Sequence, residues 1–274
     1  MAGACLSFGQ VLTMAELEVD QAFKNLRGST QIQFKLTGTD YIGPSATPFG
    51  TTLTYSRPVP SVAQDLLMEM IESRNLIQTR RIVADGKHVW AADTLNNTYS
   101  TARYGSYTAA KPTDYEQNAF QSLNIFTADQ SVWPARIVRE IFGGTTALYR
   151  PWIPASSVRT EYTVQVATGP IADPVVPTRV YTPTPTKKFH MYYLTKSGLV
   201  SRSMTFEMDI NGGTGAWDLT AVYYSDKSKV GVQNRLMDWK MDVYSGILPT
   251  AGNFVYTPTP GARAIASPRP NGGG

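Results

Sequence analysis

The chain has 274 residues, of which 42% are apolar and 17% charged, and its net charge is +4. That charge is spread thinly, so the sequence carries no electrostatic footprint for nucleic acid. One cysteine excludes an intrachain disulfide and a cysteine-based metal cluster, and two histidines leave little material for catalysis. The composition therefore favours a binding or structural protein over an enzyme.

The opening segment 1–10, MAGACLSFGQ, is small, apolar and uncharged. A secretory signal peptide has a basic start, an apolar stretch and a small-residue cleavage region, and the basic start is missing here. We therefore interpret the segment as the last third of a signal peptide, with cleavage near Gly9 or Gln10. Two alternatives stay open: a lipobox remnant with Cys5 as the lipidated residue, or an ordinary N-terminus of a cytosolic or virion protein.

A helix and a strand open the folded part of the chain. Thr13 and Glu16 have the spacing of a capping box, and Gly28 stands where a glycine ends a helix. From 31 to 37, in QIQFKLT, apolar and polar residues alternate strictly, which predicts a strand with one solvated face.

Strand and turn patterns dominate the next segment. Residues 66–71 alternate between two faces, and the stretch 80–93 predicts a hairpin because Asp85 and Gly86 suit a type I′ turn. A second turn is predicted at 96–97, where two asparagines follow each other.

The middle of the chain has a different character. Residues 114–126 and 131–142 predict helices, and the proline-rich stretch 170–185 predicts a long loop or a sheet edge because proline cannot donate to a ladder. We interpret 110–185 as a proline-rich insertion in one domain that spans 11–265, followed by a low-complexity tail at 266–274.

The last third predicts an antiparallel meander with glycine-containing turns. The sum is one antiparallel sheet of many strands with a few helices, an α+β domain. The predicted strands of the meander are 191–194, 203–210, 217–223 and 237–243.

Large adaptable side chains recur on the alternating positions of these strands. Methionine and tryptophan suit a cavity that accepts flexible chains, although an ordinary core packed under helices would use the same pattern. The candidate cavity-lining residues are Met68, Met70, Trp90, Met204, Phe206, Met208, Trp217, Trp239 and Met241.

Motifs for catalysis and metal binding are weak. Neither His88 nor His190 lies near a nucleophile motif, and no phosphate-binding glycine loop is present. Residues 209–212 resemble the start of a calcium loop, but the glutamate expected at its end is missing. We therefore expect no catalytic residue, no metal and no other cofactor.

Two segments resemble the LolA-like family of outer-membrane lipoprotein-sorting proteins, of the LolA–LolB–LppX type. The stretch RRIVADGKHVWAADTLNNTY is similar to that family's strand–turn–strand, and NFVYTPTPGARAI is similar to its closing pattern. The resemblance covers most of 12–265. The matching residues are Asp85, Gly86, Trp90, Asp93, Asn97 and Tyr99 in the first segment and Phe254, Tyr256, Pro260, Gly261 and Ala262 in the second.

This resemblance implies an unclosed β-barrel: a curved antiparallel sheet with helices plugging its concave face. It implies non-enzymatic binding of lipid or lipoprotein acyl chains in an apolar cavity, with possible envelope partner proteins, in the periplasm or at the outer membrane of a bacterium. Arg57 and Arg81 are the candidates for the family's cavity arginine. The alternative function is a structural subunit of a virion or surface assembly without ligand.

Overall fold

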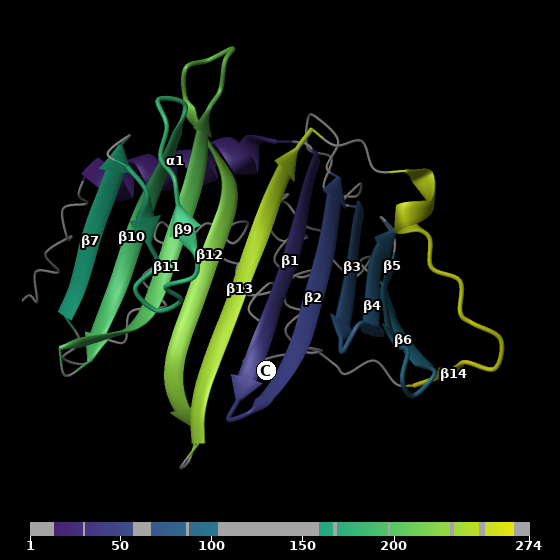
Figure 1. Cartoon of the computed structure of the whole chain (residues 1–274). Helices are drawn as coiled ribbons and strands as arrows, with labels where there is room; N and C mark the ends of the chain where they lie inside the picture. Colours follow the sequence, from purple (N-terminus) through teal and green to yellow (C-terminus); the bar gives the residue numbers. More distant parts are fainter. Residues whose placement is uncertain are drawn as a thin grey trace, which may run out of the picture.

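The computed structural model describes residues 14–29, 31–56, 67–85, 88–103, 159–166, 169–196, 198–230, 233–246 and 250–265. Among these residues, one large sheet carries one α-helix on one of its faces (Figure 1). The elements are α1 (Met14–Gly28), β1 (Gln31–Ile42), β2 (Ser45–Ser56), β3 (Leu67–Arg74), β4 (Ile77–Asp85), β5 (His88–Asp93), β6 (Thr98–Arg103), β7 (Arg159–Val166), β8 (Ile171–Ala172), β9 (Val180–Tyr181), β10 (Lys187–Lys196), β11 (Leu199–Ile210), β12 (Trp217–Val230), β13 (Gln233–Ser245), the 3-10 helix η4 (Ala251–Phe254) and β14 (Arg263–Ala264).

The large sheet is open. Its 12 strands follow the order β14-β6-β5-β4-β3-β2-β1-β13-β12-β11-β10-β7, and every pairing except the short β14–β6 contact is antiparallel. Its twisted, curved form fits the predicted unclosed sheet (Figure 1). The α+β assignment is only partly right, because the described residues are mostly strand. The helices predicted at 114–126 and 131–142 lie outside the described residues.

Two meanders meet at the centre of the sheet. The first consists of β1 to β6, and the second of β10 to β13 with β7 added at its edge. They join where β1 pairs with β13, with Phe34 opposite Val243 and Leu36 opposite Met241. The first and the last long strands are therefore neighbours, and the sheet is completed by the most distant pairing along the chain.

The predicted turns agree with the observed hairpins. β4 and β5 pair antiparallel around the Asp85 turn, although Gly86 itself lies outside the described residues. Asn97 has a φ of 49° in the β5–β6 turn, and Gly198 has a φ of 79° in the β10–β11 turn. The strand predicted at 31–37 continues to Ile42.

A β-bulge corrects the predicted faces of β12. The alternation predicts Trp217, Leu219, Ala221 and Tyr223 on one face. The register shifts, however, since Glu207 lies opposite Ala221 while Met208 lies opposite Leu219. One extra residue in a strand reverses the alternation beyond it. Val222 and Tyr224 consequently share the face of Leu219, and Tyr223 packs on the other face.

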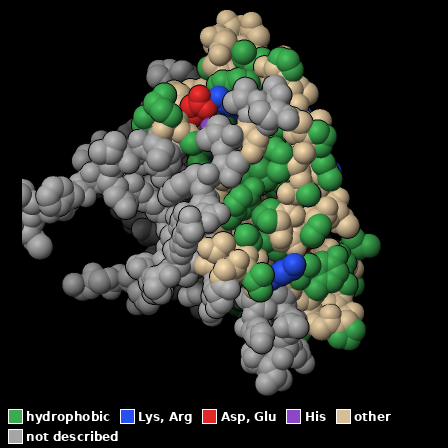
Figure 2. All heavy atoms as spheres, turned by 60° about the vertical axis from the view of Figure 1, so that its left-hand side comes forward, with side chains coloured by type: hydrophobic (Ala, Val, Ile, Leu, Met, Phe, Trp, Pro, Cys, Tyr) green, Lys and Arg blue, Asp and Glu red, His purple; other side chains and the backbone are tan. Residues whose placement is uncertain are grey.

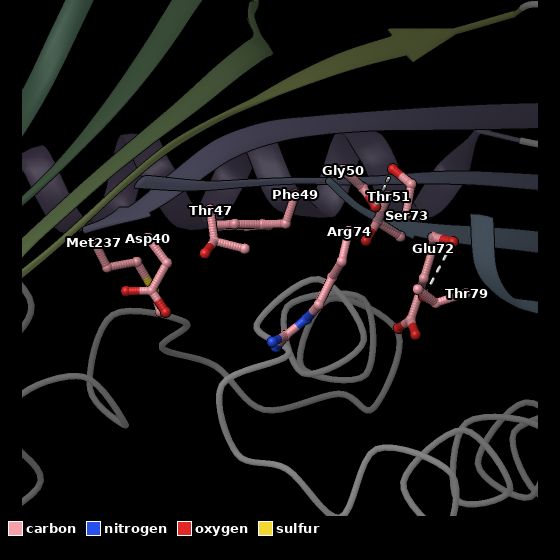
Figure 3. A pocket seen from close by; sticks show the side chains of 10 residues that line it. All are labelled: Asp40, Thr47, Phe49, Gly50, Thr51, Glu72, Ser73, Arg74, Thr79 and Met237. Carbon is pink, nitrogen blue, oxygen red and sulfur yellow. Dashed lines mark hydrogen bonds between the residues drawn. The ribbon is translucent and has the colours of Figure 1, made fainter. Parts of the chain in front are cut away.

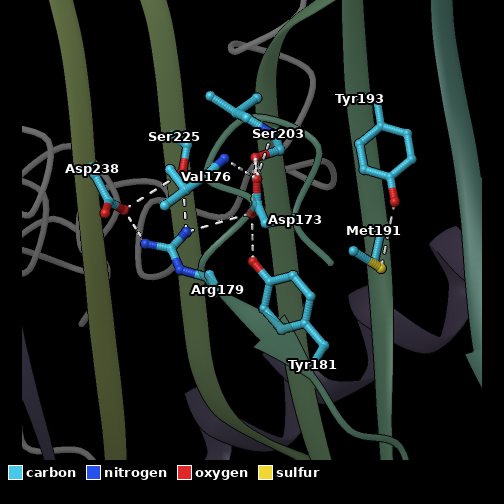
Figure 4. A network of polar contacts seen from close by, with 10 residues as sticks. Asp173, Val176, Arg179, Tyr181, Met191, Tyr193, Ser203, Ser225 and Asp238 are labelled. Carbon is cyan, nitrogen blue, oxygen red and sulfur yellow. Dashed lines mark hydrogen bonds and ion pairs between the residues drawn. The ribbon is translucent and has the colours of Figure 1, made fainter. Parts of the chain in front are cut away.

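The face of the sheet opposite α1 has polar cross-links. In the segment that contains β8 and β9, the buried carboxylate of Asp173 accepts hydrogen bonds from the Ser203 and Tyr181 hydroxyls (Figure 4). Arg179 of the same segment pairs with Asp238 of β13 and donates to Ser225 of β12. The proline-rich stretch 170–185 is thus bound to the sheet through buried polar groups.

Candidate functional site

The face of the sheet that α1 covers in part is apolar across nine strands, from β5 to β10. We call it the apolar face. It forms because side chains at every second position of a strand point the same way. Figure 2 shows patches of hydrophobic side chains on the described part of the molecule, with backbone and uncharged polar groups between them and few charged side chains. Its buried sheet residues are Ile32, Phe34, Leu36, Leu53, Met68, Met70, Ile82, Ala84, Ala91, Tyr192, Met204, Phe206, Met208, Leu219, Val222, Tyr224, Met237, Trp239, Met241 and Val243.

Eight of the nine predicted cavity residues lie on this face. Seven are buried in its cluster, and Trp217 is partly buried against it. Strands from both meanders contribute them, so residues far apart in sequence meet on one surface. Their contact with a ligand stays a prediction. The seven are Met68, Met70, Met204, Phe206, Met208, Trp239 and Met241.

Trp90 is the exception and corrects the prediction. Its strand neighbour Ala91 belongs to the apolar face, so Trp90 points to the opposite side. There its ring lies 5.5 Å from that of Tyr256 and 6.1 Å from that of Tyr99, and its Nε1 donates to Asp85 at 3.0 Å. Trp90 therefore fastens the C-terminal segment to the back of the sheet.

Helix α1 packs on the upper part of the apolar face, over β10 to β12. The Phe23 ring meets the Phe206 ring edge-on, with centroids 5.8 Å apart. Glu18 accepts from the buried Lys188 Nζ at 2.6 Å and lies 3.0 Å from the His190 Nε2 atom. Lys188 also lies 4.0 Å from the centre of the Trp217 ring. Burial lowers the pKa of His190, and Glu18 opposes this effect.

A small pocket lies at the opposite end of the same face (Figure 3). Its volume is about 50 Å³, which holds a few water-sized groups and not a whole acyl chain. Phe49 and Met237 supply apolar walls, while Asp40, Glu72 and Arg74 supply charges of both signs. The pocket therefore combines apolar and charged side chains.

Glu72 is the most buried charged group of that pocket. Burial raises the pKa of its carboxyl group, and the nearby Arg80 guanidinium opposes the rise. The Arg80 Nη1 atom lies 3.5 Å from one carboxylate oxygen, while the other oxygen, Oε1, is buried without a hydrogen-bond partner.

The next observations concern metal ligands and the two candidates for a cavity arginine. No group of three or more His, Cys, Asp or Glu side chains is placed to hold a metal ion within the described ranges. Arg81 points away from the apolar face, pairs with Glu69 at 2.7 Å and donates to the Val255 carbonyl. Arg57 lies outside the described residues. In the part of the chain that the structure describes, no helix is long and apolar enough to cross a membrane.

Several residues of the apolar face are missing from the predicted set. Leu53, Ile82 and Phe34 belong to this face, and the strict alternation at 31–37 marks Phe34 as inward-facing. The alternation in the sequence does not place Val222 and Tyr224 on this face, because it does not reveal the bulge in β12 that turns them toward it. α1 adds Phe23 to the same cluster.

No family model and no curated protein matches the chain. Among solved structures, it resembles an uncharacterized conserved protein from Thermus thermophilus, with a TM-score of 0.38 and 11% identity over 93% of this chain and 99% of that one. A DUF1329 family protein from Desulfovibrio piger has a TM-score of 0.35 and 9% identity over 88% and 96% of the two chains. LprF from Mycobacterium bovis has a TM-score of 0.34 and 10% identity over 88% and 97%. Likenesses of this size assign neither a family nor a function.

Proposed function

We propose that this protein binds the acyl chain of a lipid or of an acylated protein on the apolar face, and that it performs no catalysis. The observation that carries the proposal is the placement of methionine. Of nine methionines in the chain, six lie together in the apolar cluster: Met68, Met70, Met204, Met208, Met237 and Met241. Unbranched thioether side chains repack easily, which suits a partner that is itself flexible.

The width of the apolar face supports the same proposal. Nine strands at about 4.8 Å spacing make a surface close to 40 Å wide. α1 has 15 residues, which corresponds to a length of about 22 Å, and it crosses the β10–β12 side only (Figure 1). Apolar residues thus extend well beyond the reach of the helix, and they are packed there too: Met68, Met70 and Ile82 are at most 1% exposed, so an acyl chain enters this layer only if its side chains move apart.

Burial of an acyl chain would supply enough free energy for non-covalent binding. At about 0.8 kcal/mol per methylene, a twelve-carbon stretch contributes roughly 10 kcal/mol before ordering costs. Because the pocket near Phe49 is small, binding requires the methionine side chains to move apart. The mixed charges around that pocket would suit the polar end of the ligand, with the chain directed toward Met237 and Met241.

A binder of this kind acts where acyl chains meet water. We place it in the bacterial cell envelope, with the donor or acceptor of the acyl chain as its partner, following the sequence resemblance to lipoprotein-sorting proteins.

A photoreactive fatty acid carrying a diazirine tests the proposal. After irradiation of the purified full chain, peptide mass spectrometry should find the label in β3, β11 and β13, whose methionines line the apolar face. Met191 is an internal control because it is equally buried in the cluster on the opposite face. Labelling concentrated around Met191 would contradict the proposal.

A pair of matched variants measures the contribution of the face. Met70→Gln should weaken fatty-acid binding about tenfold, because an amide replaces an apolar contact in the site. Met191→Gln makes the same change on the other face and should leave the affinity unchanged. Equal effects of both variants, or a lipid-free high-order oligomer by native mass spectrometry, would argue for a structural protein instead.

A further inference from the structure

The lower edge of the sheet in Figure 1 is formed by hairpin turns, four of which expose a large apolar side chain. We call these four residues the tip residues. They come from the β1–β2, β3–β4, β5–β6 and β10–β11 turns. In the same order, they are Ile42 (38% exposed), Leu76 (89%), Leu95 (64%) and Leu199 (76%).

The strand registers place these turns at one end of the sheet. Asn75 donates its backbone N–H to the Pro48 carbonyl, which ties the β3–β4 turn to β2. Thr94 donates to the Thr79 carbonyl, which ties the β5–β6 turn to β4. At the other end of the strands, the β11–β12 turn from 211 to 216 contains only Asn, Gly, Thr and Ala. Ile210 beside that turn is 41% exposed, but the more exposed apolar side chains of the hairpins, Leu76, Leu95 and Leu199, all belong to the lower edge.

The backbone of Leu76 has a conformation that is unfavourable for a residue with a side chain. Its φ is 64° and that of Asn75 is 50°, so the pair forms a tight turn of the type that normally takes glycine at the second position. A leucine there is strained, and its side chain is almost fully exposed to water. Neither backbone geometry nor packing explains a leucine at this position.

From this edge we infer that the protein docks on a lipid bilayer surface through the four tip residues. Adjacent hairpins lie about 10 Å apart, since each contributes two strands. Tyr41 and Ile77 are also exposed beside Ile42 and Leu76, so the edge presents small apolar groups at separate hairpins, whereas a protein partner needs one continuous patch. A fluid interface, by contrast, accepts each side chain separately.

The charges and the pocket agree with this orientation. Lys227, near the lower end of β12, is exposed and suits anionic headgroups. The pocket lined by Asp40, Thr47 and Arg74 opens close to the same edge, near the β1–β2 and β3–β4 turns. Docking would therefore bring that pocket next to the bilayer. The inference goes beyond the proposed function and does not depend on an acyl chain being bound.

Flotation with vesicles tests the inference. The full chain should float with vesicles of phosphatidylcholine and phosphatidylglycerol. Leu76→Gly and Leu95→Ser should each lower the partition coefficient about fivefold. Val180→Ser is the matched control, because Val180 is 55% exposed in β9 and away from the tips, and it should float like the wild type.

Leu76→Gly keeps the test independent of folding. Glycine relieves the positive φ, so the variant should melt at the same or a higher temperature while its membrane binding falls. A wild-type chain that does not float, or equal flotation of Leu76→Gly and Val180→Ser, would overturn the inference. So would an oligomer that Leu76→Gly converts to a monomer, since the tips would then bind protein. Fatty-acid binding without vesicles should be unchanged in the tip variants, which separates this result from the proposed function.

Discussion

Gly38 lies in β1 directly opposite Trp239 of β13. A Cβ at this position would stand 2.5 Å from the Trp239 Cβ, 2.6 Å from the Asp238 carbonyl oxygen and 2.8 Å from the Phe49 ring. Two of these neighbours are fixed to the backbone and cannot rotate away. The largest buried side chain of the sheet therefore depends on a residue without a side chain in the neighbouring strand.

Gly38→Ala should lower the free energy of unfolding by about 1–3 kcal/mol, because overpacking displaces a strand. Urea titration followed by tryptophan fluorescence measures the loss. Gly50→Ala is the control, since its Cβ would lie 3.1 Å from the Ser73 hydroxyl, which can rotate. If the two variants lose equal stability, the close contact with β13 is not the reason why glycine is required at position 38.

At the scale of elements, α1 is docked by a combination of apolar and charged contacts. Phe23 packs against Phe206, and Glu18 faces both Lys188 and His190. The Nδ1 atom of His190 is buried without a hydrogen-bond partner. The contact between helix and sheet therefore contains a titratable group whose neutral form burial favours.

This geometry predicts a stability that falls with acid. Burial lowers the pKa of His190 in the folded chain below its usual 6.5, and both Lys188 and desolvation act in that direction against Glu18. As pH falls through 6.5, the unfolded chain binds a proton that the folded chain does not, so stability present above this pH is lost. Urea midpoints at pH 7.5, 6.5 and 5.5 should decline for the wild type.

His190→Gln should flatten this decline, and His88→Gln, which changes the only other histidine, should keep it. A decline that persists unchanged in His190→Gln would locate the titrating group elsewhere.

For the whole molecule, the order of strands sets the order of local stability. β1 and β13 lie in the interior of the sheet, with paired neighbours on both sides. Among the residues that the structure describes, β7 is an edge strand, and β6 pairs beyond β5 only with the two residues of β14. Strands with buried side chains and two partners open only by global unfolding.

Hydrogen exchange should therefore be slowest in peptides from β1 and β13 and faster in those from β6 and β7. Mass spectrometry of exchanged peptides checks this order. Faster exchange in β1 than in β7 would contradict this order. It would mean that the hydrogen bonds between β1 and β13 open before those of the edge strands, so that the two meanders separate first.

Much of the local structure of this protein followed from the sequence alone, and alternation of apolar and polar residues was its clearest signal within a strand. It identified the first strand and the shared face of Met68 and Met70, because side chains in a strand have a period of two, while the turn residues at 85–86 identified the hairpin between β4 and β5. The capping-box spacing of Thr13 and Glu16 and the glycine at 28 likewise identified α1. These are local properties, and local residues decide them.

The tertiary structure alone decided how strands relate to one another. The stretch 88–93 has apolar residues on both of its sides, so alternation did not show which side meets the apolar face, and Trp90 was assigned to the wrong one. Alternation also cannot show an extra residue opposite a partner strand, so the bulge in β12 moved Tyr223 to the back. The apolar face, its pocket and the row of exposed tips exist only once β1 pairs with β13, because this long-range pairing aligns the two meanders. The sequence of a strand does not specify which distant strand it pairs with.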